Sequence, residues 1–197
     1  RIVDKDPSTA YAIYIRQSTS VLGAAIVTTG TGGGSSDWYS NEFGLTATVN
    51  SWQHIVFVWD SATAQANIYK DSIAGTAQAR DGDNVGTNTN FFRIGNSSGS
   101  DRSFNGLIDE VRIYNRALGA DEIKRLYRIG ATLKINKPLY TGSLTSGLVG
   151  SWSFDGPDMA GVTAYDRSGQ ANNGTLTNGP TRAIGQLGQA LSFDGVN

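Results

Sequence analysis

The sequence predicts an all-β protein, an antiparallel β-sandwich (jelly roll) with one short helix near residues 120–129. Short segments in which apolar and polar residues alternate dominate the first 115 of the 197 residues. The chain contains 25 glycines, many of them between these segments, where they indicate turns. A helical pattern is found in one place. Many short strands, glycine-rich turns and a single helix are typical of sandwiches and jelly rolls.

The strongest predicted strand covers residues 52–60. Its alternation places apolar side chains on both faces, which favours a central strand that is covered on both sides. We therefore expect Trp52 and Trp59 to be core residues. Segments 65–70 and 73–79 follow and form a predicted hairpin. Further strands are predicted at 11–15, 22–29, 43–47, 91–95 and 106–114.

A helix is predicted over residues 121–129. Acidic residues occupy its first turn, basic residues its last turn, and Gly130 follows as a stop signal. Residues 131–146 contain a proline and several Ser, Thr and Gly residues, which indicates a connector. Three more strands are predicted at 148–154, 174–177 and 189–193, and Trp152 in the first of them is expected to be buried.

Composition excludes several classes of function. A net charge of −1 leaves no basic field for a nucleic acid or an anionic membrane, and no apolar run approaches the roughly 18–20 residues of a membrane span. The chain has no Cys and one His, His54, so thiolate and multi-His metal sites are excluded. Asp109 and Glu110 are adjacent and would point to opposite faces of one strand, so they form no glycosidase pair. The sequence therefore predicts a protein that is not an enzyme.

Two stretches resemble motifs of one known family. Residues 104–118 (FNGLIDEVRIYNRAL) with the following 121–123 are similar to the closing motif of laminin-G-like, concanavalin-A-like jelly rolls. Residues 148–155 (LVGSWSFD) with 164–176 resemble the opening motif of the same family, and 52–69 resembles its middle. The resemblance spans most of the chain and implies the jelly-roll fold.

The two motifs occur in the reverse of the family's order, because the closing motif precedes the opening one. Two explanations stay open: a slice through a tandem array of repeats, or a circularly permuted single sandwich. A β-fragment of about 50 residues buries too little surface to offset its chain entropy. We therefore predict that 1–130 is the body of the sandwich, that 131–146 is a tether, and that 147–197 supplies strands that complete the same sandwich. The strands that the family usually has after this point are missing at residue 197. We therefore expect either an incomplete sheet edge or a partner chain that completes the sheet.

The resemblance implies calcium as a structural cofactor. Family members often hold Ca²⁺ at an Asp of the closing strand, which corresponds to Asp109, with backbone carbonyls of the opening strand near Asp155 and with Asp166. Ca²⁺ prefers such hard oxygen ligands. As the alternative, Asp109 accepts backbone N–H bonds or pairs with Arg112 or Arg93, and Asp166 forms an Asx-type turn.

The resemblance also implies carbohydrate binding, in which exposed aromatic rings stack on sugars. Trp38 and Tyr39, beside Asn41, follow a glycine run and are predicted to lie on a loop. Asn96 and Asp101 belong to a second polar loop that is expected to contact the ligand. The alternatives are an aromatic loop anchor that folds back onto the sandwich and a solvated hairpin end.

These observations predict a non-catalytic, laminin-G-like module of an extracellular or cell-surface protein. Its expected partners are a glycan or cell-surface polymer and neighbouring repeats of a longer chain, and its expected role is adhesion or glycan recognition. The absence of Cys suits a bacterial surface protein better than an animal extracellular domain. Two alternatives stay open: a structural spacer repeat, and a glycoside hydrolase remnant.

Overall fold

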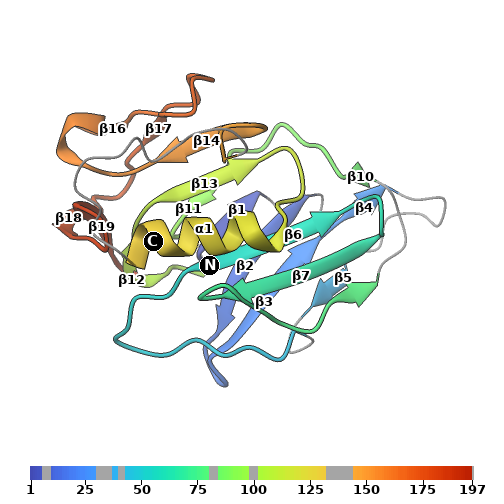
Figure 1. The fold of residues 1–197 in the computed structure, drawn as a ribbon. Helices are drawn as coiled ribbons and strands as arrows, with labels where there is room; N and C mark the ends of the chain where they lie inside the picture. The colour runs from blue at the N-terminus through green and yellow to red at the C-terminus, as the bar shows by residue number, and fades with distance from the viewer. Residues whose placement is uncertain are drawn as a thin grey trace. The chain divides into compact units, whose positions relative to one another are not determined.

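The computed structural model describes residues 1–5, 10–29, 37–39, 43–79, 84–97, 102–131 and 144–196 (Figure 1). These residues form short antiparallel strands, one α-helix and short 3-10 turns, so the predicted all-β fold class with a single helix is confirmed for the described part of the chain. The chain divides into two compact units, residues 1–104 and 105–196, which we describe one after the other.

The first unit contains a five-stranded antiparallel sheet with the order β11-β1-β2-β3-β5. Its strands are β11 (Arg93–Ile94), β1 (Val3–Lys5), β2 (Tyr11–Arg16), β3 (Val21–Ile26) and β5 (Asp37–Tyr39). The register aligns one residue of each strand in a single row across the sheet, in the order Arg93, Asp4, Ala12, Ala25 and Trp38. This row begins on β11 and ends on β5, and these two are the end strands of the described sheet.

A second sheet of the first unit is built on the predicted hairpin, which is confirmed. It contains β6 (Ile55–Asp60), β7 (Gln65–Lys70), β8 (Ile73–Ala74) and β9 (Gln78–Ala79), and a separate pair joins β4 (Thr28–Thr29) to β10 (Asn84–Val85). Asp71 and Ser72, between β7 and β8, both have a positive φ, as a tight turn requires. The Oδ1 atom of Asp71 also accepts a hydrogen bond of 2.9 Å from the backbone N–H of His54.

The core of the first unit lies between the two sheets. Leu22 and Ala24 of β3, in the first sheet, share one buried cluster with Ala66 and Ile68 of β7, in the second. Phe43 is fully buried in the same cluster. Apolar residues of both sheets face each other, which is the arrangement of a β-sandwich.

Three predictions about this unit are wrong in detail. Segment 43–47 is not a strand among the described residues and makes one isolated bridge, from Thr46 to Val21. Strand β6 begins at Ile55, and Trp52, which precedes it, is 38% exposed and not a core residue. Strand β6 also lies at an end of its described sheet and not at the centre. A local pattern of apolar residues indicates that a segment can form a strand. The strands that pair with it decide where it starts and where it lies in the sheet.

The second unit contains three small antiparallel sheets and the helix. Its strands are β12 (Asn105–Ile108), β13 (Val111–Tyr114), β14 (Leu148–Trp152), β15 (Met159–Ala160), β16 (Thr163–Ala164), β17 (Gly174–Thr175), β18 (Thr181–Ile184) and β19 (Gln189–Asp194). They pair in the orders β12-β19-β18, β13-β14 and β15-β16-β17. The 3-10 turn η2 (Gly156–Asp158) lies between β14 and β15.

The closing and opening motifs meet in this unit, although their order along the chain is reversed. Strand β13 pairs with β14, where Val111 lies opposite Trp152, and β12 pairs with β19, where Ile108 lies opposite Leu191. Trp152 is buried, as expected. That residues 1–130 and 147–197 complete one sandwich stays a prediction.

The predicted helix is confirmed as α1 (Ala120–Ala131). The carboxylate of Glu122 in its first turn accepts a hydrogen bond of 3.0 Å from the backbone N–H of Gly119 and two of 2.8 Å from the guanidinium of Arg116. These contacts satisfy a free N–H group at the start of the helix. Ile123 and Leu126 are buried, as the apolar stripe indicates.

Candidate functional site

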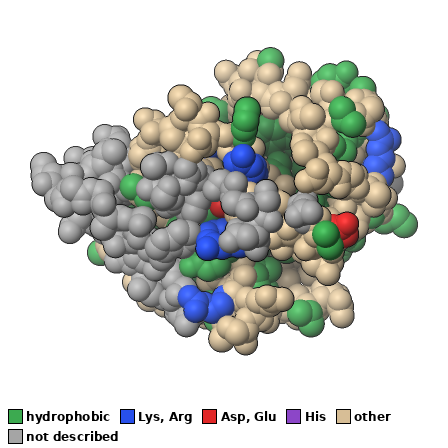
Figure 2. Space-filling view, turned by 180° about the vertical axis from the view of Figure 1, so that it is seen from behind, with side chains coloured by type: hydrophobic (Ala, Val, Ile, Leu, Met, Phe, Trp, Pro, Cys, Tyr) green, Lys and Arg blue, Asp and Glu red, His purple; other side chains and the backbone are tan. Residues whose placement is uncertain are grey.

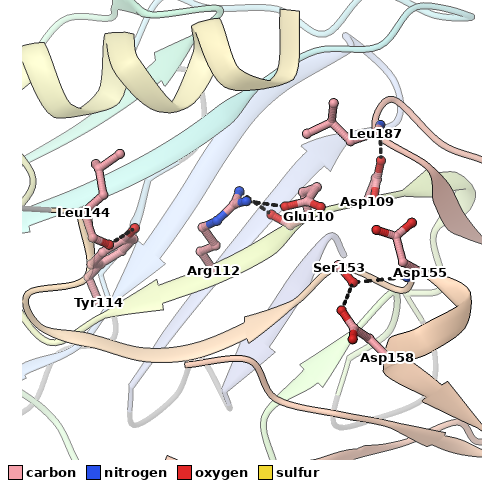
Figure 3. Close-up of polar contacts among 9 residues, drawn as sticks. All are labelled: Asp109, Glu110, Arg112, Tyr114, Leu144, Ser153, Asp155, Asp158 and Leu187. Carbon is pink, nitrogen blue, oxygen red and sulfur yellow. Dashed lines mark hydrogen bonds and ion pairs between the residues drawn. The ribbon is translucent and has the colours of Figure 1, made fainter. Parts of the chain in front are cut away.

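The candidate site lies where the closing motif is interrupted. The predicted continuous strand 106–114 is wrong, because β12 ends at Ile108 and β13 begins at Val111. Glu110, between them, has a φ of +53°, a left-handed backbone conformation that ends the pleat. Asp109 and Glu110 therefore do not alternate as neighbours on one strand. Figure 3 shows the Asp109 carboxylate beside Leu187 and the Glu110 carboxylate beside Arg112.

Two carboxylates bind the turn between β18 and β19. Asp109 accepts a hydrogen bond of 2.9 Å at Oδ2 from the N–H of Leu187, and Asp155 accepts one of 2.8 Å at Oδ1 from the N–H of Gln189. The turn is closed by a bond of 3.0 Å from the N–H of Gly185 to the carbonyl of Gly188. Asp109 and Asp155, which lie 46 positions apart in the sequence, thus meet at one short turn.

The two glycines of this turn leave the space that the carboxylates occupy. A Cβ atom at Gly185 would lie 2.6 Å from Asp109 Oδ2 and 2.8 Å from the backbone carbon of Gln189. A Cβ atom at Gly188 would overlap the carboxylate of Asp155, and Gly188 has a φ of +64°. Both positions therefore require glycine.

The electrostatics of the site disfavour its negative charges. Burial raises the pKa of the Asp109 carboxyl, backbone N–H groups at Leu187 and Gln186 lower it, and the nearby charge of Asp155 raises it. Burial likewise raises the pKa of Glu110, against the effect of Arg112. Two carboxylates in a partly buried place are stabilised by a cation or by further hydrogen-bond donors.

Two oxygen atoms at the site lack a donor. Asp109 Oδ1 and Gln189 Oε1 are buried and accept no hydrogen bond from the described residues. With Asp155, they are oxygen ligands of the kind that Ca²⁺ prefers, so the residues present fit that ion. The described residues contain no group of three or more His, Cys, Asp or Glu side chains that could hold a metal. A Ca²⁺ ion at this turn would therefore also need backbone carbonyls or water as ligands.

Asp166, the third predicted metal ligand, accepts hydrogen bonds at both of its carboxylate oxygens. Its Oδ1 accepts hydrogen bonds of 2.8 Å from the N–H groups of Ser151 and Ser168, and its Oδ2 accepts bonds from Ser168 Oγ (2.7 Å) and the N–H of Asn172 (2.9 Å). Burial acts to raise the pKa of this carboxyl, but the hydrogen bonds outweigh it and lower the pKa. Asp166 thus forms the Asx-type turn that was its alternative interpretation.

The neighbouring charged side chains form ion pairs. Arg112 forms an ion pair with the carboxylate of Glu110 and also donates to its backbone carbonyl at 3.3 Å. Asp158, which the sequence analysis did not single out, is buried, accepts a bond of 2.7 Å from Ser153 Oγ and lies 3.2 Å from Arg167 Nε (Figure 3). The Gly-Pro-Asp sequence after Asp155 was the available signal, because Gly, Pro and Asp are typical of tight turns.

The predicted sugar-contacting residues are only partly described. Trp38 and Tyr39 lie on strand β5 opposite Ala25 and Ala24, so their placement on a loop was wrong. Pairing with β3 extends the sheet by one strand and overrides the glycine-rich local sequence. Asn96 Oδ1 accepts a hydrogen bond of 2.7 Å from the N–H of Ser97, which makes a local turn. Asn41 and Asp101 lie outside the described residues.

A shallow concavity of about 410 Å³ adjoins the turn between β18 and β19. It is lined by Arg182, Ala183, Ile184, Gly188 and Gln189. Ile184 is 87% exposed. Figure 2 shows that hydrophobic side chains also reach the surface at several separate places on one face, among polar ones. Scattered exposure of this kind is ordinary for a protein surface and does not by itself mark a binding site.

The antiparallel sandwich of the first unit and the paired closing and opening strands of the second define a jelly-roll type of β-protein. Residues 1–124 match the laminin-G family model described as "Concanavalin A-like lectin/glucanases superfamily". The chain belongs to this superfamily, as its motifs indicated.

A solved structure is similar to the whole chain. It is a protein from Bacteroides ovatus ATCC 8483, described as a "putative carbohydrate binding protein", with 18% sequence identity and a TM-score of 0.63. The match covers 100% of this chain and 49% of that one, so the chain spans about half the length of this neighbour. At this identity the likeness concerns the fold. No curated protein sequence matches the chain. No helix among the described residues is long and apolar enough to span a membrane.

Proposed function

We propose that the chain is a non-catalytic carbohydrate-binding module of an extracellular or cell-surface protein. Membership of the concanavalin A-like lectin/glucanase superfamily carries this proposal, because the superfamily is named for proteins that bind or cleave glycans. The description of the Bacteroides ovatus neighbour supports it. Fold alone does not establish function, so the proposal also depends on what the carboxylates do.

The carboxylates of the candidate site support binding over hydrolysis. A glycosidase needs two carboxyl groups on either side of an accessible bond, about 5–5.5 Å or 6.5–9.5 Å apart. Asp109 and Asp155 instead accept hydrogen bonds from one turn, and Glu110 pairs with Arg112. Turnover of a β-glucan that is lost in Asp109→Ala or Glu110→Ala would contradict a non-catalytic role.

We assign the glycan contact to Trp38 and Tyr39, with Asn41, Asn96 and Asp101 as polar neighbours. Strand β5 supports this assignment because it is an end strand of the described five-stranded sheet, with no described strand beyond it. A glycan-array screen of the whole chain is the direct test. Binding that is lost in Trp38→Ala and Tyr39→Ala, and kept in Ile73→Ala at an exposed position of β8, would support it. No binding to any glycan or surface polymer would remove the proposed function.

We further propose that calcium has a structural role at the turn between β18 and β19. The two oxygen atoms without donors, on Asp109 and Gln189, and the adjacent Asp155 support this role. When bound, the ion supplies positive charge that offsets the repulsion between the carboxylates. The chain's own residues hold the turn through the N–H groups of Leu187 and Gln189.

A spacer repeat in a longer surface protein is the second candidate. The reversed order of the closing and opening motifs favours it, because a slice through an array of neighbouring repeats has this order. A melting temperature that calcium raises, together with no glycan or polymer bound in the array screen, would favour the spacer over the binding module.

A further inference from the structure

Phe91 is 79% exposed, although hydrogen bonds hold the segment that carries it. The backbone N–H of Asn90 donates to Asn88 Oδ1 at 2.9 Å, and Asn88 Nδ2 donates to the backbone carbonyl of Lys5 at 3.2 Å. Lys5 Nζ in turn donates to the backbone carbonyl of Asn90. The segment before β11 is thus fastened to β1, and the exposed ring is held in place.

The neighbouring aromatic residue lies against the sheet. The ring centroid of Phe92 lies 6.4 Å from that of Tyr11 on β2, with the two planes tilted by 45°. Phe92 is half-buried, whereas Phe91 is exposed. One exposed Phe needs no functional explanation, but this ring also has a charged group beside it.

The Arg93 guanidinium lies over one face of the Phe91 ring, which leaves the other face for a ligand. The centre of the guanidinium group is 5.9 Å from the ring centroid, and Nη1 donates to the backbone carbonyl of Phe91 at 3.5 Å. Within the described part of the chain, Arg93 forms no ion pair. Asp4, opposite Arg93 in the register, pairs with Arg1 at 3.4 Å. Among the described residues, Arg93 donates to the carbonyl of Phe91 alone, so further N–H donors of the guanidinium can meet an anion.

We propose that Phe91 and Arg93 bind an acidic sugar residue of a polysaccharide. The apolar face of the pyranose ring stacks on Phe91, and its carboxylate accepts hydrogen bonds from the Arg93 guanidinium. Lys5 is a positioning residue that holds the segment. This inference rests on the proposed carbohydrate-binding function and specifies the class of glycan.

The contact is separate from the one assigned to Trp38. Arg93 and Trp38 occupy opposite ends of the row of five aligned residues across the sheet. Four strand spacings separate them, which is roughly 19 Å. Substitutions at the two ends therefore test the two contacts independently.

The test measures binding of the full chain to three uronate polymers, polygalacturonate, alginate and hyaluronan, by isothermal titration calorimetry. Fully methyl-esterified polygalacturonate is the matched neutral polymer. The variants are Phe91→Ala, Arg93→Gln and Arg93→Lys. The controls are Ile73→Ala, at another exposed apolar residue of the first unit, and Arg16→Gln, at an exposed arginine of β2. Far-UV circular dichroism and the melting temperature establish that each variant is folded.

We expect at least one uronate polymer to bind, and the affinity to fall about tenfold or more in Phe91→Ala, in Arg93→Gln and with the methyl ester. Added salt should weaken wild-type binding and have less effect on Arg93→Gln. Binding by Arg93→Lys should be intermediate, because an ammonium group keeps the charge and loses the two-pronged geometry. The two control variants should bind as the wild type does.

Three results would overturn the inference: no binding to any of the three uronate polymers, equal binding of the methyl ester, or unchanged affinity in folded Phe91→Ala and Arg93→Gln. If any of these three results is obtained but neutral glycans bind in the array screen, the acidic-sugar contact fails and the proposed carbohydrate-binding function stands. If the chain binds no glycan of either kind, the proposed function fails as well.

Discussion

The carboxylate of Asp109 occupies the space that a side chain at Gly185 would need. A Cβ atom at Gly185 would lie 2.6 Å from Asp109 Oδ2, and the backbone of Gln189 and Ala190 leaves no room for it to move away. The closing motif therefore packs closely against the turn between β18 and β19 through the contact of Asp109 with Gly185.

Gly185→Ala should destabilise the chain by about 1–3 kcal/mol, because the added methyl group must displace a carboxylate or backbone atoms. The midpoint of urea unfolding measures this change. Gly174→Ala is the matched control, since a Cβ atom there would make ordinary contacts of 3.7 Å or more. Equal stability of the two variants would contradict the close packing at Gly185.

Calcium should stabilise the wild type by about 1–3 kcal/mol when its concentration is 10–100 times the dissociation constant. The ion would offset the repulsion between Asp109 and Asp155, so Asp109→Asn and Asp155→Asn should lose the effect. Thermal melts with calcium and with a chelator measure it. Asp194→Asn, on β19 in the same unit, is the control that should keep the effect. A melting temperature that calcium leaves unchanged would count against the proposed cofactor.

Asp109 and Asp166 should influence acid stability in opposite directions. The pKa of Asp109 is raised in the folded state, so its stabilising contribution is greatest below about pH 4 and is lost as pH rises through the folded-state pKa. The pKa of Asp166 is lowered, so its contribution is present above about pH 4 and is lost as pH falls through the folded-state pKa.

Urea unfolding between about pH 3 and about pH 7, without calcium, tests whether the stabilising contributions of the two carboxyls depend on pH in opposite directions. Compared with the wild type, Asp109→Asn should lose less stability as pH rises, and Asp166→Asn should lose less as pH falls. Parallel pH profiles for the two variants would show that the hydrogen bonds and burial described for these carboxyls do not control their titration.

Trp152→Ala should destabilise the chain by about 3–5 kcal/mol, because it empties a buried site. The indole Nε1 also donates a hydrogen bond of 3.0 Å to the carbonyl of Asn172, which would lose its partner. Gly150→Ala should be destabilising as well, since its Cβ atom would lie 2.5 Å from the indole ring. Urea unfolding of both variants measures the cost. A double variant whose loss of stability is clearly smaller than the sum of the two single losses would show that the ring is the obstacle, and additive losses would contradict it.

Local patterns were sufficient for the elements whose periodicity is strong. The alternation over β6 and β7 and the charge pattern of α1 predicted those elements to within a few residues. The motif at 104–118 indicated the superfamily that the family match then established. Such predictions succeed because the side chains of one strand or one helix face carry the information locally.

The break between β12 and β13 was decided by the tertiary structure. Strand β12 pairs with β19, whereas β13 pairs with β14. One chain segment that serves two different partners must turn between them, and the positive φ of Glu110 is where it turns. Leu107, Val111 and Ile113 keep the same two-residue period on both sides of residues 109 and 110, so the alternation of apolar residues could not reveal this break.

The sequence by itself determined the strand-rich fold class, the helix and the family. The tertiary structure decided what Asp109 binds, namely the N–H of Leu187, 78 residues further along the chain. It likewise decided that the Asp166 carboxylate accepts a hydrogen bond from the N–H of Ser151, 15 residues earlier in the chain. The physical reason is that period and propensity act over a few neighbouring residues. Hydrogen-bond partners, burial and pKa depend instead on segments that meet only when the chain is folded.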